Sequence, residues 1–142
     1  MRIFLDTADT EVISKYFSTG LIDGVTTNPS LIMKSGRVPD EVYKEIKEIG
    51  VPDISMEVMG NDLEMYDEGI RLFETFGSVC TVKVPCTREG LIVCKRLAEQ
   101  GINVNVTLIF SAPQAVLAAK AGATYVSPFV GRLDDQQVAG LE

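Results

Sequence analysis

The sequence predicts an α/β fold of the (β/α)8 TIM-barrel type in which about six of the eight β-α units are present. Apolar strands alternate with amphipathic helices at intervals of roughly 20 to 30 residues, and no hairpin signal joins one strand to the next. This alternation is typical of parallel β-α units. Five of the expected helices end at a glycine, which readily adopts the left-handed backbone conformation common at helix C-termini. These glycines are Gly20, Gly50, Gly77, Gly101 and Gly122.

Each expected element has its own local signal. Apolar runs predict strands near residues 2–6, 22–26, 54–58, 79–84, 103–107 and 124–127. Apolar residues at helical spacing predict the helices, the first of them through Val12, Ile13, Tyr16 and Phe17. Pro39 suits the start of the second helix, and Ser111 with Gln114 forms a capping box that opens the fifth.

Two architectures fit such units, an open doubly wound sheet or a barrel. A dinucleotide-binding open sheet requires G-x-G-x-x-G after its first strand, but here that strand ends in Asp-Thr-Ala-Asp. The barrel is therefore favoured. A complete barrel takes ~250 residues, whereas this chain has 142. We expect residues 1–142 to form one incomplete barrel domain, which either belongs to a longer protein or completes its sheet by association.

Composition excludes several classes of function. The net charge is −7 and 46% of the residues are hydrophobic, which argues against nucleic acid or an anionic membrane as a partner. No apolar run approaches the ~18 residues of a membrane span. The N-terminal stretch MRIFLDTADT turns acidic too early for a signal peptide. Three cysteines, an odd number, are expected to be reduced thiols of a cytoplasmic protein.

The sequence contains no histidine. This absence removes Ser-His and Cys-His nucleophile pairs, imidazole acid-base catalysis and the usual zinc sites. Any catalysis must use Lys, Asp, Glu, Tyr, Thr, Ser or Asn.

Polar residues recur at the carboxyl ends of the expected strands, on one face. The opposite face is aliphatic, as in Val104, Val106 and Leu108 of the fifth strand. The carboxyl ends of barrel strands carry active sites, and buried polar groups are costly unless satisfied. We therefore expect one rim to gather Asp6, Asn28, Glu57, Lys83, Thr107 and Ser127.

Most of these residues also have a structural interpretation. Asp6 suits a cap for the following turn, and Asn28 before Pro29 is a common turn signal. Thr107 and Ser127, taken alone, are more often structural. Lys83 is different, because lysine is seldom buried and here it lies between two valines in the middle of a strand.

A buried lysine has a specific chemical use. Loss of water disfavours the ammonium form and makes the free amine available. A free amine attacks a carbonyl and forms a Schiff base, and the iminium then accepts electrons while a neighbouring carbon–carbon bond breaks. No metal or organic cofactor is required. Proton transfers must come from carboxylates, for which Asp6 and Glu57 are the candidates.

Five ordered motifs carry a resemblance that runs from residue 3 to about 135. They are LDTAD at 5–9, DGVTTNPSLI at 23–32, VKVPCT at 82–87, NVTLIF at 105–110 and GATYVSPFVGRLDD at 122–135. Together they resemble the transaldolase family, and more narrowly its short branch that includes fructose-6-phosphate aldolase. The resemblance implies a (β/α)8 barrel that passes a dihydroxyacetone unit from a ketose phosphate to an aldose phosphate.

The resemblance also implies roles for individual residues. Lys83 is the Schiff-base lysine, and Asp6 is the acid-base group during carbon–carbon cleavage. Glu57 and Thr107 hold the water of Schiff-base formation. The remaining matches concern the substrate: Arg132 binds its phosphate, and its hydroxyls are bound by Asn28, Asn105 and Ser127, with Thr26 nearby.

Two positions separate the branches of the family. The aldolases carry Gln where this chain has Glu57 and Tyr where it has Phe129, so transfer is favoured over free aldol cleavage. The last two strands of the family, which complete the phosphate site, have no counterpart here. The alternatives are therefore fructose-6-phosphate aldolase activity, or a truncated barrel that binds sugar phosphate or a partner chain without turnover. The resemblance also implies a homo-oligomer.

Overall fold

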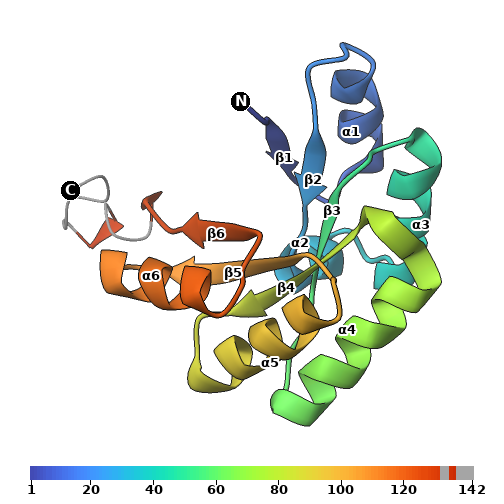
Figure 1. Cartoon of the computed structure of the whole chain (residues 1–142). Coiled ribbons are helices and arrows are strands. Elements are labelled where there is room, and N and C mark those ends of the chain that lie inside the picture. The colour runs from blue at the N-terminus through green and yellow to red at the C-terminus, as the bar shows by residue number, and fades with distance from the viewer. Residues whose placement is uncertain (132–134, 137–142) are drawn as a thin grey trace. The chain divides into compact units, whose positions relative to one another are not determined.

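The computed structural model describes residues 1–131 and 135–136. Strands and helices alternate along this part of the chain (Figure 1). The strands are β1 (Phe4–Asp6), β2 (Gly24–Thr26), β3 (Ile54–Glu57), β4 (Cys80–Pro85), β5 (Val104–Ile109) and β6 (Tyr125–Pro128). The helices are α1 (Thr10–Phe17), α2 (Pro29–Lys34), α3 (Pro39–Ile49), α4 (Asp62–Phe76), the 3-10 turn η1 (Gly77–Val79), α5 (Arg88–Glu99) and α6 (Ala112–Lys120).

The chain forms two compact units whose boundaries fall inside α4 and β4. The first unit contains Met1–Glu57 and Ile70–Val82, and the second contains Val58–Gly69 and the chain from Lys83 onward. One half of α4 and one half of β4 therefore belong to each unit.

In the first unit the strands follow the order β1-β2-β3-β4. β1 and β2 are parallel, with Asp6 opposite Thr26, and β2 continues in parallel to β3, with Val25 opposite Ile54. Helices α1 and α3 pack together. Gly24 allows β2 to lie close to its neighbours in the sheet, since a Cβ there would overlap the Phe4 ring of β1 and approach the carbonyl oxygen of Asp53, which precedes β3, to 2.8 Å.

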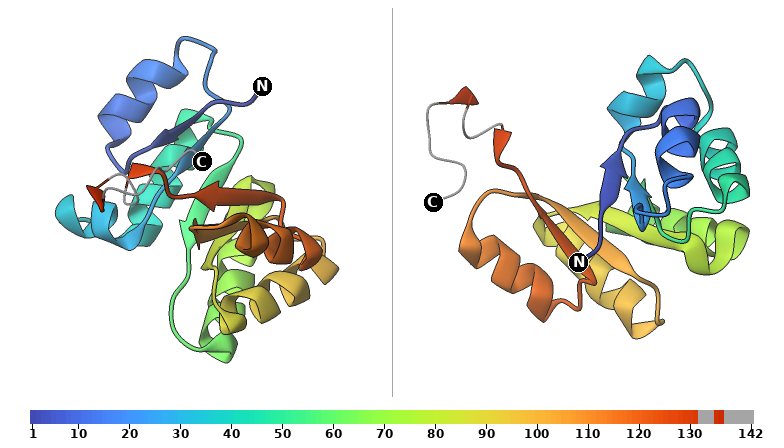
Figure 2. Two further views of the ribbon diagram at one scale, coloured as in Figure 1. Left: turned by 90° about the vertical axis from the view of Figure 1, so that its left-hand side faces the viewer. Right: turned by 90° about the horizontal axis from the view of Figure 1, so that it is seen from above.

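In the second unit the order is β4-β5-β6, and β5 and β6 are parallel. Helix α5 packs on β5, and α6 packs on both β5 and β6. Figure 2 shows the two helices alongside these strands. The side chains of Val104 and Val106 are fully buried, which places the aliphatic face of β5 in the core of this unit.

The predicted α/β class with six parallel strands is confirmed. All five glycines expected at helix ends have a positive φ, between 74° and 102°. Pro39 begins α3, and Ser111 is the N-cap of α6, where its hydroxyl accepts from the Gln114 amide at 3.5 Å. The Gln114 side chain accepts from the Phe110 amide at 2.8 Å, one residue earlier than a simple capping box requires.

Helix α2 was not expected, because Asn28-Pro29 was interpreted only as a turn. Asn28 is in fact the N-cap of α2, and Pro29 occupies its first turn. Proline suits that position because its missing N–H would have had no helical partner. The helix has six residues, too few to show a periodic apolar stripe.

The alternation predicted for β5 fails at Leu108. Leu108 was expected to share the aliphatic face with Val104 and Val106, but Ile109, only 2% exposed, takes that place. The register with β6 shifts between Val106 and Ile109, and Leu108 has φ 60°. A β-bulge therefore adds one residue to β5 at this point.

Among residues 1–131 and 135–136, no helix has the length and apolar character that a membrane crossing would need.

Candidate active site

Asp6 and Thr26 lie side by side at the carboxyl ends of β1 and β2. The parallel register places them opposite each other, and the Thr26 hydroxyl donates to Asp6 Oδ1 at 2.9 Å. Asp6 is exposed, whereas Thr26 is half-buried. The carboxylate is thus oriented by a neighbouring strand. The helix that follows is capped by Asp9, which accepts from the amides of Glu11 and Val12, so Asp6 is not needed as its cap.

Asn28 combines a structural role with its candidate role. Its side-chain oxygen caps α2 by accepting from the Leu31 amide at 2.9 Å. Asn28 thus has a structural role, as a helix cap and not as part of a turn. The side-chain amide nitrogen can still donate to a substrate hydroxyl, and the second lone pair of the oxygen can still accept from one.

Glu57 ends β3 and is half-buried. Its charge contributes to the environment of Tyr43, a buried residue of α3. The pKa of Tyr43 is raised to about 12, mainly by burial, with a further increase from the Glu57 carboxylate and an opposing effect of the hydrogen bond to Thr27. From the sequence, Tyr43 is predicted only as part of the apolar stripe of its helix, because helical periodicity does not indicate that a phenol lies near a strand end.

Lys83 occupies the middle of β4 and is 6% exposed. Its sequence neighbours, Val82 and Val84, are fully buried. Its backbone carbonyl accepts from the Val58 amide at 3.0 Å. In the described part of the chain Lys83 is the only charged residue in the buried set, so the burial predicted from the sequence is confirmed.

Three further candidates lie in β5 and β6 of the second unit. Asn105 and Thr107 are each 2% exposed. Asn105 Oδ1 accepts from the Ser127 hydroxyl at 2.7 Å, a cross-strand contact. The Thr107 carbonyl accepts from the Cys86 amide at 2.8 Å. The Thr107 hydroxyl is buried and has no hydrogen-bond partner within the described residues.

Phe129 follows β6 and is half-buried. Its ring packs edge-on against Phe110, with centroids 5.5 Å apart and planes at 61°. Its amide donates to the Ile109 carbonyl at 2.8 Å, which fixes the chain directly after the bulge. Arg132, the predicted phosphate ligand, lies outside the described residues.

The candidates are distributed over both units. The first unit holds Asp6, Thr26, Asn28 and Glu57, and the second holds Lys83, Asn105, Thr107, Ser127 and Phe129. In the first unit Asp6 is in direct contact with Thr26, and in the second Asn105 is in direct contact with Ser127. The gathering of all of them at one rim stays a prediction.

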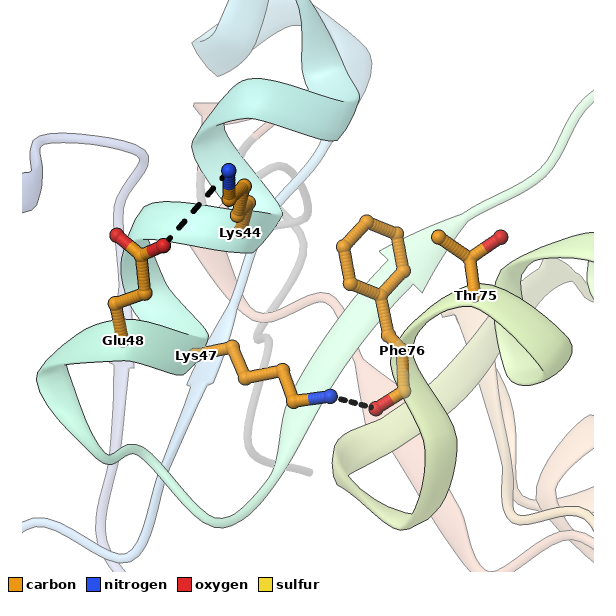
Figure 3. Close-up of a pocket in the computed structure, with 5 residues that line it drawn as sticks. All are labelled: Lys44, Lys47, Glu48, Thr75 and Phe76. Carbon is orange, nitrogen blue, oxygen red and sulfur yellow. Dashed lines mark hydrogen bonds and ion pairs between the residues drawn. The ribbon is translucent and has the colours of Figure 1, made fainter.

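Two cavities of the first unit contain none of the predicted residues. One, of about 450 Å³, is lined by Lys44, Lys47, Glu48, Thr75 and Phe76 (Figure 3). Its central contact, Lys47 Nζ to the Phe76 carbonyl at 2.8 Å, satisfies a carbonyl at the end of α4. The other, of about 460 Å³, lies beside the start of α1 and includes Arg37, which is paired with Glu45 at 2.6 Å. The Lys47–Phe76 hydrogen bond satisfies a helix end and the Arg37–Glu45 contact is a surface ion pair, so the polar contacts of both cavities have a structural explanation.

Comparisons with known proteins agree with the motifs. Residues 3–141 match the family model described as "Transaldolase/Fructose-6-phosphate aldolase". A "Probable transaldolase" of Hyphomonas neptunium is 56% identical over the whole chain, which spans 66% of that protein. A "Probable transaldolase" of Nitrosopumilus maritimus is 54% identical over 95% of the chain and 61% of its own length. The chain thus spans slightly less than two thirds of these relatives.

Solved structures agree at the level of the fold. The carboxyl transferase domain from Rhizobium etli pyruvate carboxylase matches with a TM-score of 0.59 and 13% sequence identity, covering 93% of this chain and 27% of that one. At this identity the likeness concerns the fold alone. The family match and the close relatives are the stronger evidence, and the chain belongs to the transaldolase/fructose-6-phosphate aldolase family.

Proposed function

We propose that this chain carries the catalytic residues of a transaldolase with Lys83 as the Schiff-base residue. The observation that supports it most is the burial of Lys83, 6% exposed within an otherwise apolar strand of a family member. A lysine that forms a Schiff base acts as a nucleophile inside the protein, and a lysine in the middle of a buried strand is otherwise unusual. The relatives named as probable transaldolases supply the reaction class.

The proposed reaction begins with attack of Lys83 Nζ on the ketone carbon of a ketose phosphate. The resulting carbinolamine loses its hydroxyl as water and becomes an iminium. The bond between C3 and C4 then breaks, its electron pair moves into the iminium to give an enamine, and the proton of the C4 hydroxyl passes to a carboxylate. An aldose phosphate leaves, a second one accepts the enamine carbon, and water releases the product from the lysine.

The other candidates take the roles implied by the family. Asp6 receives the C4 hydroxyl proton, an assignment supported by its orientation through Thr26. Glu57 and Thr107 hold the water, in keeping with the unpartnered Thr107 hydroxyl. Asn28, Asn105 and Ser127 bind the hydroxyls of the dihydroxyacetone unit, and Arg132 binds phosphate through a bidentate guanidinium. A single barrel domain, a cytoplasmic location and a homo-oligomer belong to the same proposal.

The test is a transfer assay with sedoheptulose 7-phosphate as donor and glyceraldehyde 3-phosphate as acceptor. We expect fructose 6-phosphate to form only when both are present, and K83M to abolish it. K44M is the matched control, since Lys44 is exposed, with 74% of its side chain accessible. Release of free dihydroxyacetone from fructose 6-phosphate without an acceptor would favour the aldolase alternative. Binding of sugar phosphate without turnover would favour the inactive alternative.

A further inference from the structure

The bulge in β5 lies directly after a candidate active-site residue. Val106 is opposite Val126 and Ile109 is opposite Pro128, so three steps along β5 match two along β6. The extra residue is accommodated at Leu108, whose φ of 60° places it in the left-handed region. Among the described residues other than glycine it alone has a positive φ.

Leucine is an unfavourable residue for this conformation. A left-handed backbone brings Cβ close to the following carbonyl oxygen, so glycine or asparagine normally occupies it. Such a residue persists only where its surroundings determine it, and these positions cluster at functional sites. Hydrogen bonds fix both sides of Leu108: the Thr107 carbonyl accepts from Cys86, and the Ile109 carbonyl accepts from Phe129, each at 2.8 Å.

The bulge lies next to a buried hydroxyl, that of Thr107, which is unpaired in the described part of the chain. Thr107 is 2% exposed, and its hydroxyl has no partner among the described residues. Ser127, on the neighbouring strand, donates instead to Asn105 at 2.7 Å. A bulge bends its strand and re-aims a side chain, and here it follows the one buried hydroxyl of the described chain that is left unpaired.

We propose that Leu108 is a positioning residue: its left-handed backbone holds the Thr107 hydroxyl unpaired and directed at the water of Schiff-base formation. This inference rests on the proposed function. Thr107 exchanges no net proton in the step; its hydroxyl holds the water that leaves the carbinolamine and later returns to hydrolyse the iminium. Leu108 touches neither water nor substrate and acts through the backbone of Thr107.

The experiment separates backbone conformation from side-chain loss. L108I keeps the atoms of leucine but adds β-branching, which strongly disfavours a positive φ. L108G and L108A both remove the side chain, yet only glycine enters the left-handed region freely. L117I is the matched control, because Leu117 is an exposed residue of α6 with no such constraint.

The readout is the rate of Schiff-base formation with saturating fructose 6-phosphate, measured by borohydride trapping on the intact chain. We expect about a tenfold loss in L108I, equal to about 1.4 kcal/mol in the barrier, with an unchanged half-saturating fructose 6-phosphate concentration. L108G should trap within about threefold of wild type and faster than L108A, a comparison that remains informative if L108I does not fold. L117I should match wild type.

A double-mutant cycle decides whether Leu108 acts through Thr107. T107V should slow trapping, and L108I added to T107V should slow it no further, because the hydroxyl being positioned is already gone. A further tenfold loss in the double variant, or an unchanged rate in L108I, would contradict the positioning role. A wild-type chain that forms no adduct would instead contradict the proposed function, and the positioning role with it.

Discussion

Lys83 shows how a single residue links the sequence to the chemistry. Desolvation of an ammonium is costly, so lysine is seldom buried without a function or a partner. Lys83 is 6% exposed and lies between two fully buried valines, which makes it the candidate nucleophile of the proposed reaction. The sequence pattern was sufficient to predict this burial, since an apolar strand around one lysine leaves that lysine little access to water.

Tyr43 provides a residue-scale prediction about pH. Its folded-state pKa is about 12 against 10.0 for the free side chain, chiefly because of burial. The phenol therefore stabilises the folded chain fully below pH 10, and this contribution is lost as the pH rises towards 12. As the pH rises from 10 to 12, the unfolding free energy of Y43F should therefore fall by about 2 to 3 kcal/mol less than that of the wild type. Urea unfolding between pH 9 and 12 measures this loss.

The exposed Tyr16 is the matched control for this experiment. Its ring lies on the outer side of α1 and is 46% exposed. Y16F should leave the alkaline slope unchanged. Equal slopes for wild type and Y43F would show that the Tyr43 phenol does not titrate in the way its burial requires.

The three thiols should differ in reactivity. Burial raises the pKa of Cys80 to about 12, with a smaller contribution from Asp53, and burial raises that of Cys94 to about 11. Cys86 is only half-buried, and this partial burial also raises the pKa of its thiol. Because the thiolate is the reactive form, an aromatic disulfide reagent at pH 8 should modify Cys86 first. The other two should react only as the chain unfolds, and C86S should abolish the fast phase; two fast thiols in wild type would contradict this.

At the scale of elements, α5 depends on a glycine that lets it approach β4. The Gly90 amide donates to the Thr87 hydroxyl at 3.0 Å, and a Cβ at Gly90 would overlap the Pro85 carbonyl oxygen. β4 ends at Pro85 and carries Lys83, so this packing fixes the helix directly after the strand of the proposed nucleophile.

G90A should therefore lower the unfolding free energy by about 3 kcal/mol, since backbone atoms must shift to relieve the overlap. G101A is the control: Gly101 has φ 76° but open space around its Cβ position, so only about 1 kcal/mol of backbone strain is expected. Chemical denaturation of both variants makes the comparison. Equal losses would mean that the approach of α5 to β4 is not what requires Gly90.

The elements that could be predicted from the sequence are those with a regular apolar pattern or a glycine at the helix end. The six strands and the glycine helix ends follow from apolar alternation and from the steric freedom of glycine at positive φ. Helix α2 escaped prediction because it is one and a half turns long and begins with Asn28-Pro29, which equally signals a turn. The bulge at Leu108 escaped because NVTLIF contains neither glycine nor asparagine at the left-handed position.

At the scale of the whole molecule, the chain spans 61 to 66% of the length of the relatives compared. Phe129 is a candidate only through the family motif at 122–135, because no periodicity marks an aromatic residue after a strand as functional, whereas Glu57 follows from the alternation of polar and apolar residues in its strand.

The choice between transfer and free cleavage should depend on those two residues. Glutamate relays protons where glutamine cannot, and a phenol in place of Phe129 would protonate the enamine carbon. E57Q/F129Y should therefore release free dihydroxyacetone from fructose 6-phosphate without an acceptor, at least about tenfold faster than wild type. F110Y is the control for an added phenol, since Phe110 packs on Phe129 at 5.5 Å. Unchanged release in E57Q/F129Y would contradict this division of roles.

The central claim is that Lys83 forms the covalent intermediate. The most direct measurement is peptide mapping by mass spectrometry after borohydride reduction of the chain with fructose 6-phosphate. We expect one stable sugar-derived adduct, located on Lys83, absent from K83M and retained in K44M. An adduct spread over the exposed lysines, or one that persists in K83M, would contradict it.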